Sequence, residues 1–355
     1  MTTAADPDAL TRLIGAPPSP ELDDAVARRL SEKAHRIETM LGRPVDVTHP
    51  SPRASGYRAR LSLRPDRDGA LGQSLPGTHA HVPLRSVPLA RAELNRVLPQ
   101  LPPMPGFGQV ELRSDGERVV LSAWSPRKGR GARNRRNRGA TPALRDAIRN
   151  LDLAGSGLAG AALDGRAIAG AATTALHVAG IDHVLSPDTF FQVNLEVNAA
   201  LVAAVGRLAR ELEPSALLDL YAGAGNLSLP LAAEGVPTVL VESGRSSTAD
   251  AQRTIARRKL PAEVRTADAG RFSAGDAFFD VAILDPPRAG APGVLPQLAL
   301  TRPRGILYVS CNPSALVRDL RPLSASGYQV DRVEVFDMFP QTPHAEVLVR
   351  LVRQP

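Results

Sequence analysis

The chain has 355 residues, more than one compact domain usually holds, and its hydrophobic content of 43% is enough for a buried core. No apolar run reaches the roughly 18–20 residues of a membrane-spanning helix, and the start has no secretory signal, so we expect a cytoplasmic protein without a membrane partner. A single cysteine, Cys311, excludes an intrachain disulfide, a cysteine-ligated iron–sulfur cluster and a cysteine-based zinc site, and we expect no bound metal.

The net charge of +7 is unevenly distributed along the chain. Residues 1–185 carry a balance of +8, and residues 186–355 a balance of −1. A GC-rich genome would explain why arginine outnumbers lysine, but it would not explain this asymmetry. The surplus predicts that the N-terminal half binds a polyanionic partner.

The first 185 residues predict a small α+β domain. Residues 19–42 have the amphipathic pattern of a helix, and residues 50–125 consist of short strand-like runs, with SDGE at 114–117 as a hairpin turn. Residues 127–138, RKGRGARNRRNR, contain seven basic residues and no acidic residue, which predicts a loop rather than a packed element. Both interpretations of this loop stay open: contact with an RNA backbone, and a plain solvated loop.

From residue 186 onward, apolar strand-like runs alternate with helical stretches, which predicts a parallel sheet covered on both faces. The run LLDLYAGAGN (217–226) predicts a strand, a tight turn and a helix start, because Gly223 and Gly225 allow a close backbone approach to a ligand. Glu242 ends the next strand and is placed to accept hydrogen bonds from ribose hydroxyls. An adenosine-bearing ligand fits this pattern, and the alternative is a structural turn with an incidental glutamate.

Two further strands end in reactive residues. Asp285 follows VAIL, and Cys311 follows ILYVS. Because the carboxyl ends of parallel strands meet at one edge of a sheet, we expect both side chains at the same site. The alternative for a lone cysteine is a small buried apolar residue, but such a residue would more naturally lie inside the apolar run. Glu346 opens the last strand, where a solvated strand end is the alternative.

These segments resemble the uracil-C5 RNA methyltransferase family, which forms 5-methyluridine in transfer and ribosomal RNA. The matching segments occur in the family's order and spacing: SPDTFFQVN (186–194), DLYAGAGNLSLPLA (219–232), VES (241–243), LDPPRAG (284–290), YVSCNP (308–313) and DMFPQTPHAEV (337–347). The resemblance implies an α/β class I, Rossmann-like S-adenosylmethionine-dependent methyltransferase domain over residues 186–355. A weaker match over 51–84 implies that residues 1–185 are the smaller, strand-rich RNA-binding domain.

The resemblance also implies a role for each matching residue. Cys311 corresponds to the nucleophile that adds to C6 of uracil, and Glu346 to the base that removes the C5 proton. The implied contacts to S-adenosylmethionine are made by Gln192, Tyr221, Gly223, Asn226, Glu242, Asp268 and Asp285. The resemblance implies that Asp285 also contacts the substrate. We expect Arg288 and His344 to contact it too, and the alternative for a lone histidine such as His344 is a structural role. The expected partner is tRNA or rRNA, with no obligatory protein partner.

Two other functions stay open. An amino-group methyltransferase acting on nucleic acid also uses an Asp-Pro-Pro strand end, but it has an aromatic residue where this chain has Arg288, and it leaves no role for Cys311 or Glu346. A non-catalytic RNA-binding protein with a methyltransferase fold would need neither residue. Replacing Cys311 distinguishes both from the covalent mechanism.

Overall fold

The computed structural model describes residues 11, 14–75, 80–126, 141–275 and 277–354. The basic segment 127–138 lies outside the described residues, so its two interpretations, contact with RNA and a solvated loop, both stay open. The chain divides into two compact units: one comprises residues up to 22, 54–176 and 185–188, and the other residues 23–53, 177–184 and 189–355. In the part that the structure describes, no helix is both long and apolar enough to cross a membrane.

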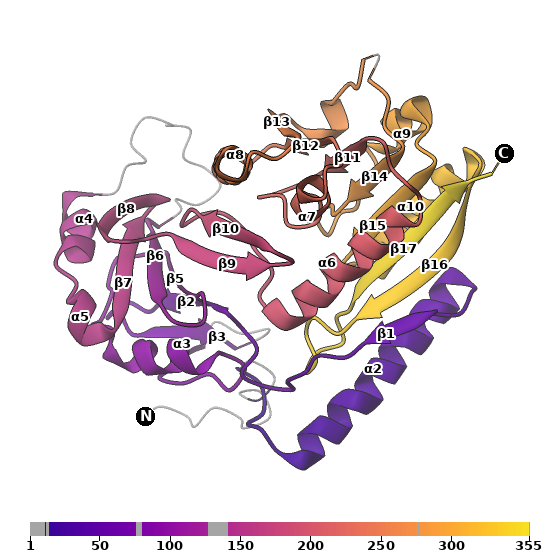
Figure 1. Cartoon of the computed structure of the whole chain (residues 1–355). Coiled ribbons are helices and arrows are strands. Elements are labelled where there is room, and N and C mark those ends of the chain that lie inside the picture. Colours follow the sequence, from indigo (N-terminus) through magenta and orange to yellow (C-terminus); the bar gives the residue numbers. More distant parts are fainter. Residues whose placement is uncertain (1–10, 12–13, 76–79, 127–140, 276, 355) are drawn as a thin grey trace, which may run out of the picture. The chain divides into compact units, whose positions relative to one another are not determined.

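The second unit is built on one large sheet (Figure 1). Its described strands follow the order β1 (Val47–His49), β16 (Tyr328–Phe336), β17 (Glu346–Arg353), β15 (Gly305–Ser310), β14 (Val281–Leu284), β11 (Leu217–Leu220), β12 (Thr238–Glu242) and β13 (Ala262–Thr266). Strands β11–β15 are parallel to their neighbours within that group, whereas β17 is antiparallel to both β15 and β16. We call the edge formed by the C-terminal ends of β11–β15 the carboxyl edge.

The strand order reverses between β11 and β14, because the chain moves from β11 to β12 and β13 on one side and from β14 to β15 on the other. Ligands of open α/β sheets bind at the carboxyl edge beside such a reversal. The side chains of β14 and β15 are buried along their whole length, as expected of strands covered on both faces. The α/β fold predicted from the alternating pattern is therefore confirmed.

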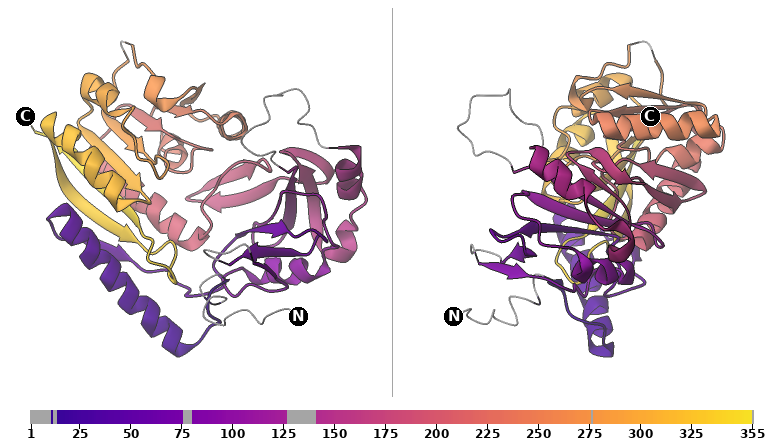
Figure 2. Two further views of the ribbon diagram at one scale, coloured as in Figure 1. Left: turned by 180° about the vertical axis from the view of Figure 1, so that it is seen from behind. Right: turned by 90° about the vertical axis from the view of Figure 1, so that its left-hand side faces the viewer.

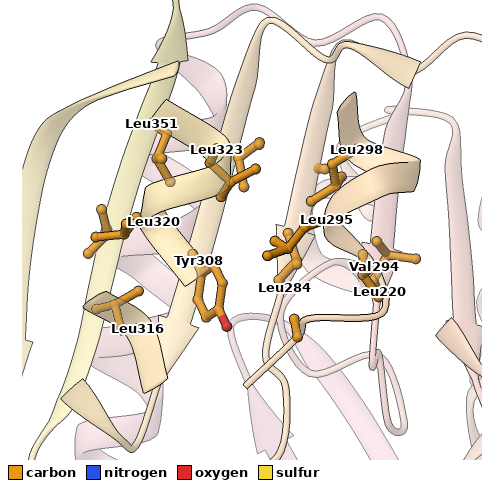
Figure 3. Close-up of a cluster of buried hydrophobic side chains, with 14 of the residues drawn as sticks. Leu220, Leu284, Val294, Leu295, Leu298, Tyr308, Leu316, Leu320, Leu323 and Leu351 are labelled. Carbon is orange, nitrogen blue, oxygen red and sulfur yellow. The ribbon is translucent and has the colours of Figure 1, made fainter. Parts of the chain in front are cut away.

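Helices pack on this sheet through apolar side chains. The helices of the second unit are α2 (Pro20–Leu41), of which residues from 23 onward belong to this unit, α6 (Leu195–Arg210), α7 (Leu229–Ala233), α8 (Arg245–Arg258), η2 (Ala269–Arg271), α9 (Leu295–Thr301) and α10 (Pro313–Ala325). Figure 3 shows leucines of α10 beside Tyr308 of β15 and Leu351 of β17. This packing fixes the position of Tyr308, which lies two residues before Ser310, the last residue of the strand.

The N-terminal helix α2 belongs to the second unit from residue 23 onward, although the sequence assigns residues 1–185 to one N-terminal domain. Leu30 and Ile37 of α2 are buried in the core of the large sheet, and β1 pairs in parallel with β16. Figure 2 shows α2 along the side of the sheet that carries β16 and β17. The pairing of β1 with a strand nearly 300 residues later leaves no trace in the local pattern of residues 1–50, which explains the difference.

The first unit contains a second sheet with its own core. Its strands follow the order β4 (His81–Pro83), β3 (Leu71–Ser74), β2 (Arg60–Pro65), β5 (Gln109–Ser114), β6 (Val119–Trp124), β7 (Leu158–Leu163) and β8 (Arg166–Gly170). Its helices are α3 (Ala92–Val97), η1 (Leu98–Gln100), α4 (Pro142–Arg149) and α5 (Leu153–Ser156). The predicted hairpin turn joins β5 to β6, where Gly116 has φ +105°. The strand-rich N-terminal region is therefore confirmed.

A two-stranded sheet of β9 (Thr174–Val178) and β10 (Ile181–Leu185) follows the first unit's main sheet in the chain. Ala179 and Gly180 between the strands both have positive φ, as a tight two-residue hairpin turn requires. Asn194 then caps α6 by accepting a hydrogen bond from the Val197 N–H at 3.3 Å. The segment between the hairpin and this cap carries Gln192.

Candidate active site

Four acidic or thiol side chains gather at the carboxyl edge. Glu242 ends β12, Asp285 follows β14, and Cys311 follows β15. In the antiparallel β15–β17 pair Ser310 lies opposite Val347, so the adjacent residues Cys311 and Glu346 come together at the end of this ladder. The structure thus brings together residues that lie up to about a hundred positions apart in the sequence.

Cys311 is half-buried and lies in a strongly ionic environment. Burial raises the pKa of its thiol, and the nearby carboxyl groups of Glu346 and Asp285 raise it further. A hydrogen bond and the positive charge of Arg288 act in the opposite direction. These effects together raise the pKa of the thiol, and Arg288 is the group that counteracts the rise.

The pKa values of the two carboxyl groups near Cys311 are raised. Only 3% of Glu346 is exposed, and burial raises its pKa well above the usual value, with a further rise from Asp285 and an opposing effect of Arg288. Burial raises the pKa of Asp285 to about 7. Perturbed acids next to a thiol are typical of sites that move protons.

The loop that carries Arg288 is fixed by side chains of α10. The Asn312 side-chain amide donates to the Arg288 carbonyl at 2.9 Å. Asp319, which is 1% exposed, accepts hydrogen bonds from the Ala291 N–H and the Tyr308 hydroxyl, both at 2.7 Å. Both ends of the segment after Asp285 are therefore held, and Arg288 within it is close enough to Cys311 to lower the pKa of the thiol.

His344 also lies beside Arg288, with 3.3 Å between its Nδ1 atom and Nη2 of the arginine. Burial lowers the pKa of His344, and the charge of Arg288 lowers it further. The imidazole is therefore neutral at pH 7 and can accept a hydrogen bond from the guanidinium. The predicted substrate-contacting residues Arg288 and His344 are thus neighbours of Cys311 and Glu346.

The glycine turn lies at the same edge, directly after β11. Tyr221 has φ +63°, which is unusual for a residue with a side chain, and Gly223 has φ +56° with open space where a Cβ would project. At Gly225, a Cβ would come within 2.5 Å of Leu229. Strain at Tyr221 and open space at Gly223 are features of a backbone shaped for a ligand.

Glu242 and Asn226 face this turn with defined partners. One carboxylate oxygen of Glu242 accepts the Gly223 N–H at 3.0 Å, and the other accepts the Gly244 N–H at 2.6 Å. Asn226 exchanges two side-chain hydrogen bonds with Asn198 of α6, at 2.8 and 3.0 Å. The Oε1 atom of Glu242 also accepts the Ser243 hydroxyl at 3.3 Å, so Oε2 is the oxygen that keeps a lone pair for a further donor, such as a ribose hydroxyl.

Two more predicted residues lie in segments that reach this edge. Asp268 follows β13, and its carboxylate accepts the Gly270 N–H at 2.8 Å, while the preceding Ala267 N–H donates to the Glu242 carbonyl at 2.9 Å. Gln192 is half-buried in a segment held by the Thr189 hydroxyl, which donates to the buried Asp250 at 2.5 Å. In the part of the chain that the structure describes, no hydrogen bond joins Gln192 to Cys311, Asp285 or Glu346.

Several residues of the site have no signal in the sequence pattern. Asp319 and the Thr189–Asp250 pair anchor the loops, and their partners are distant in the chain. Phe190 is 57% exposed, which is unusual for so large an apolar side chain, and it lies two residues before Gln192. The FF pair in the matching segment SPDTFFQVN was the available signal for Phe190. Within the described residues, no group of three or more His, Cys, Asp or Glu side chains is arranged to hold a metal ion.

Comparison with known proteins identifies the family to which this chain is similar. Residues 172–354, a little over half of the chain, match the family model described as tRNA (Uracil-5-)-methyltransferase. The 23S rRNA (uracil(1939)-C(5))-methyltransferase RlmD of Klebsiella pneumoniae is 39% identical over 183 residues, which are 49% of this chain and 42% of the relative. An uncharacterized RNA methyltransferase of Thermotoga maritima is 39% identical over 174 residues, 48% of this chain and 39% of the relative.

A solved structure extends the likeness beyond this region. The tRNA (uracil-54, C5)-methyltransferase of Pyrococcus abyssi, crystallised with S-adenosyl-L-homocysteine, superposes with a TM-score of 0.73 over 92% of this chain and 83% of that one. Its sequence identity is 24%, so this likeness concerns the fold. The matches to the curated relatives cover less than half of the relatives' own length. With the family match over more than half of its length, the chain belongs to the tRNA (uracil-5-)-methyltransferase family.

Proposed function

We propose that this protein transfers a methyl group from S-adenosylmethionine to C5 of a uracil in tRNA or rRNA, which forms 5-methyluridine. The observation that carries the proposal is the placement of the half-buried thiol of Cys311 beside the buried carboxyl of Glu346, with Arg288 hydrogen-bonded to the thiol. Membership of the family supports the same activity.

The residues at the glycine turn fit S-adenosylmethionine. Glu242 offers the Oε2 atom of its carboxylate to a ribose hydroxyl, and Gly223 leaves room for close approach. Tyr221, Asn226 and Asp268 would complete the nucleoside site, and Gln192 and Asp285 would face the part that carries the sulfonium. When bound, this group supplies an electrophilic methyl group.

The thiol of Cys311 supplies what the uracil ring lacks. Carbon 5 of uracil is a poor nucleophile. Addition of the Cys311 thiolate to C6 converts C5 into an enolate carbon that can accept a methyl cation. Arg288 stabilises the thiolate by its hydrogen bond and charge, which counteracts part of the effect of burial. Asp285 can hydrogen-bond the uracil ring while protonated, because its pKa is about 7.

The carboxylate of Glu346 completes the reaction. After C5 has received the methyl group, the carboxylate accepts the C5 proton, the electron pair of the C5–H bond forms the C5–C6 double bond, and the C6–S bond breaks to regenerate the Cys311 thiolate. The raised pKa of Glu346 makes it a stronger base than an exposed glutamate. The proton then leaves the site for the next cycle.

The RNA must present its uracil outside the base stack, because the thiol has to reach C6 from one face of the ring. The surplus of positive charge in residues 1–185 supports contact of that half with the RNA backbone. Phe190, with its exposed ring beside Gln192, offers an apolar surface to an unstacked base.

The test is replacement of the nucleophile. In Cys311→Ala, transfer of radioactive methyl groups to unmodified tRNA or rRNA should fall below detection, while Ser314→Ala, an exposed neighbour three residues away, should retain wild-type activity. Methylation that survives in Cys311→Ala would point to an amino-group methyltransferase. RNA binding without methylation in the wild type would point to a non-catalytic protein. Mapping 5-methyluridine in total RNA of a deletion strain would identify the target nucleotide.

A further inference from the structure

The loop of residues 337–345 connects β16 to β17 and leads directly to Glu346. Phe336, the residue before the loop, lies opposite Glu346 in the β16–β17 register. Both ends of the loop are therefore beside the proposed base.

A buried lysine of α2 holds this loop from a distance of 304 residues along the chain. The ammonium of Lys33 lies 2.6 Å from Oδ1 of Asp337 and donates to the Phe339 carbonyl at 3.1 Å. Lys33 is 2% exposed and Asp337 is fully buried. Burying a lysine carries a large desolvation cost, so a lysine kept at a core position of a helix calls for a specific role.

The contact of Lys33 continues along the loop toward the site. The same Phe339 carbonyl accepts the Thr342 N–H and the Thr342 hydroxyl, both at 3.0 Å. The Thr342 oxygen in turn accepts the His344 N–H at 3.2 Å. One continuous set of hydrogen bonds thus runs from Lys33 to the backbone of His344, two residues before Glu346.

Two arginines on either side of Lys33 on α2 contact the same loop. Arg36 donates to the Pro343 carbonyl at 2.6 Å, and Arg29 lies 3.5 Å from the Pro340 carbonyl. Positions four residues before and three after Lys33 share its face of the helix. Helix α2 therefore presents three cations to three carbonyls of the loop, with the buried Lys33 in the middle.

We propose that Lys33 is a positioning residue for the proton-removal step, because it holds the loop that sets the direction of the Glu346 carboxyl. The role rests on the proposed function, in which Glu346 accepts the C5 proton. Lys33 itself contacts neither the thiol nor the carboxyl of Glu346, so its loss should affect release of the covalent adduct far more than its formation.

The experiment compares Lys33→Met with Arg28→Met, a matched change at an exposed position of the same helix. Single-turnover reactions with methyl-labelled S-adenosylmethionine and RNA measure how fast the methylated protein–RNA adduct forms and how fast it is released, on denaturing gels. For Lys33→Met we expect formation within about twofold of wild type and release slowed roughly 10- to 100-fold, since small displacements of reacting groups have effects of this size. Arg28→Met should match the wild type in both steps.

Thr342→Val provides a second variant, because it removes the hydroxyl between Phe339 and His344 without disturbing the helix. It should show the same selective slowing of release to a smaller extent, so the role stays testable if Lys33→Met folds poorly. Circular dichroism and thermal melting give the folded fraction of each variant.

Three results would overturn the positioning role. Release at the rate of Arg28→Met in both Lys33→Met and Thr342→Val would show that the base needs no such support. If the rates of adduct formation and release in Lys33→Met both fell in proportion to its unfolded fraction, Lys33 would have only a structural role. Absence of any Cys311-dependent adduct in the wild type would instead overturn the proposed function itself, and the positioning role with it.

Discussion

Replacing Glu346 by glutamine should separate the two halves of the proposed reaction. Glutamine has nearly the volume of glutamate, so it fits a site in which the side chain is 3% exposed, but it cannot accept the C5 proton. The substitution also removes one of the two carboxyl groups that raise the pKa of Cys311. Formation of the adduct should therefore be as fast as in the wild type or faster, and its release should be slow.

The magnitude follows from the role of the base. Loss of a general base slows a step by about 10²- to 10⁴-fold, which corresponds to roughly 3–5 kcal/mol in the barrier. If formation and release are equally fast in the wild type, half of the enzyme is adduct at steady state. A hundredfold slower release raises this share to about 99%. A fall of one unit in the pKa of Cys311 makes the thiolate population about tenfold larger.

The assay is a denaturing gel of the protein mixed with RNA and methyl-labelled S-adenosylmethionine. A slowly migrating band that carries both protein and methyl label should accumulate in Glu346→Gln and disappear on treatment with ribonuclease. The double variant Cys311→Ala and Glu346→Gln is the control and should give no band. If Glu346→Gln turned over at the wild-type rate without accumulating adduct, another group would have to remove the proton.

Three further predictions concern Arg288, Glu242 and Glu334. Because Arg288 lowers the pKa of Cys311, Arg288→Met should move the alkaline rise of iodoacetamide alkylation to higher pH, and an unchanged midpoint would contradict the assigned contact. Glu242→Gln should weaken S-adenosylmethionine binding about 10- to 100-fold by calorimetry, since hydrogen bonds to a charged group contribute roughly 1.5–3 kcal/mol; wild-type affinity would place the ribose elsewhere. Burial would raise the pKa of the buried Glu334, but hydrogen bonds from His49 and Arg207 and the charge of Arg207 outweigh it and hold the pKa at about 2, against 4.5 for a free glutamate. Its ionised form should therefore contribute about 3 kcal/mol of stability above pH 4.5 that is lost as the pH falls toward 2, so Glu334→Gln should lower the urea midpoint at pH 7 and have little effect near pH 2.

The site residues at strand ends were accessible from the sequence because their signal is local. An apolar run followed by Asp285-Pro or by Cys311-Asn marks the end of a buried strand, and parallel strands share one edge. Glu242 and Gly223 follow from the same reasoning, and the structure shows that they are in contact through a hydrogen bond from the Gly223 N–H to Glu242. The strand that opens at Glu346 was predicted from the order of the matching segments.

What the sequence does not reveal depends on pairings between distant residues. In the sequence, Lys33 is one of several cations on an amphipathic helix, and only the fold shows that it is buried against Asp337. Likewise, Asp319 has the pattern of an ordinary helix residue until its contacts with Ala291 and Tyr308 are known. Such contacts do not change the local periodicity of the sequence. The sequence therefore predicts the candidate reactive residues of the site but not the residues that support them.

The central claim, a bond between Cys311 and C6 of a uracil, can be tested directly with RNA that contains 5-fluorouracil. Fluorine at C5 cannot leave as a cation, so the adduct should persist after methyl transfer. Mass spectrometry of the digested complex should then find the nucleotide and the added methyl group on the peptide that contains Cys311. A complex that forms equally well in Cys311→Ala, or a modified nucleotide attached to a different residue, would contradict the claim.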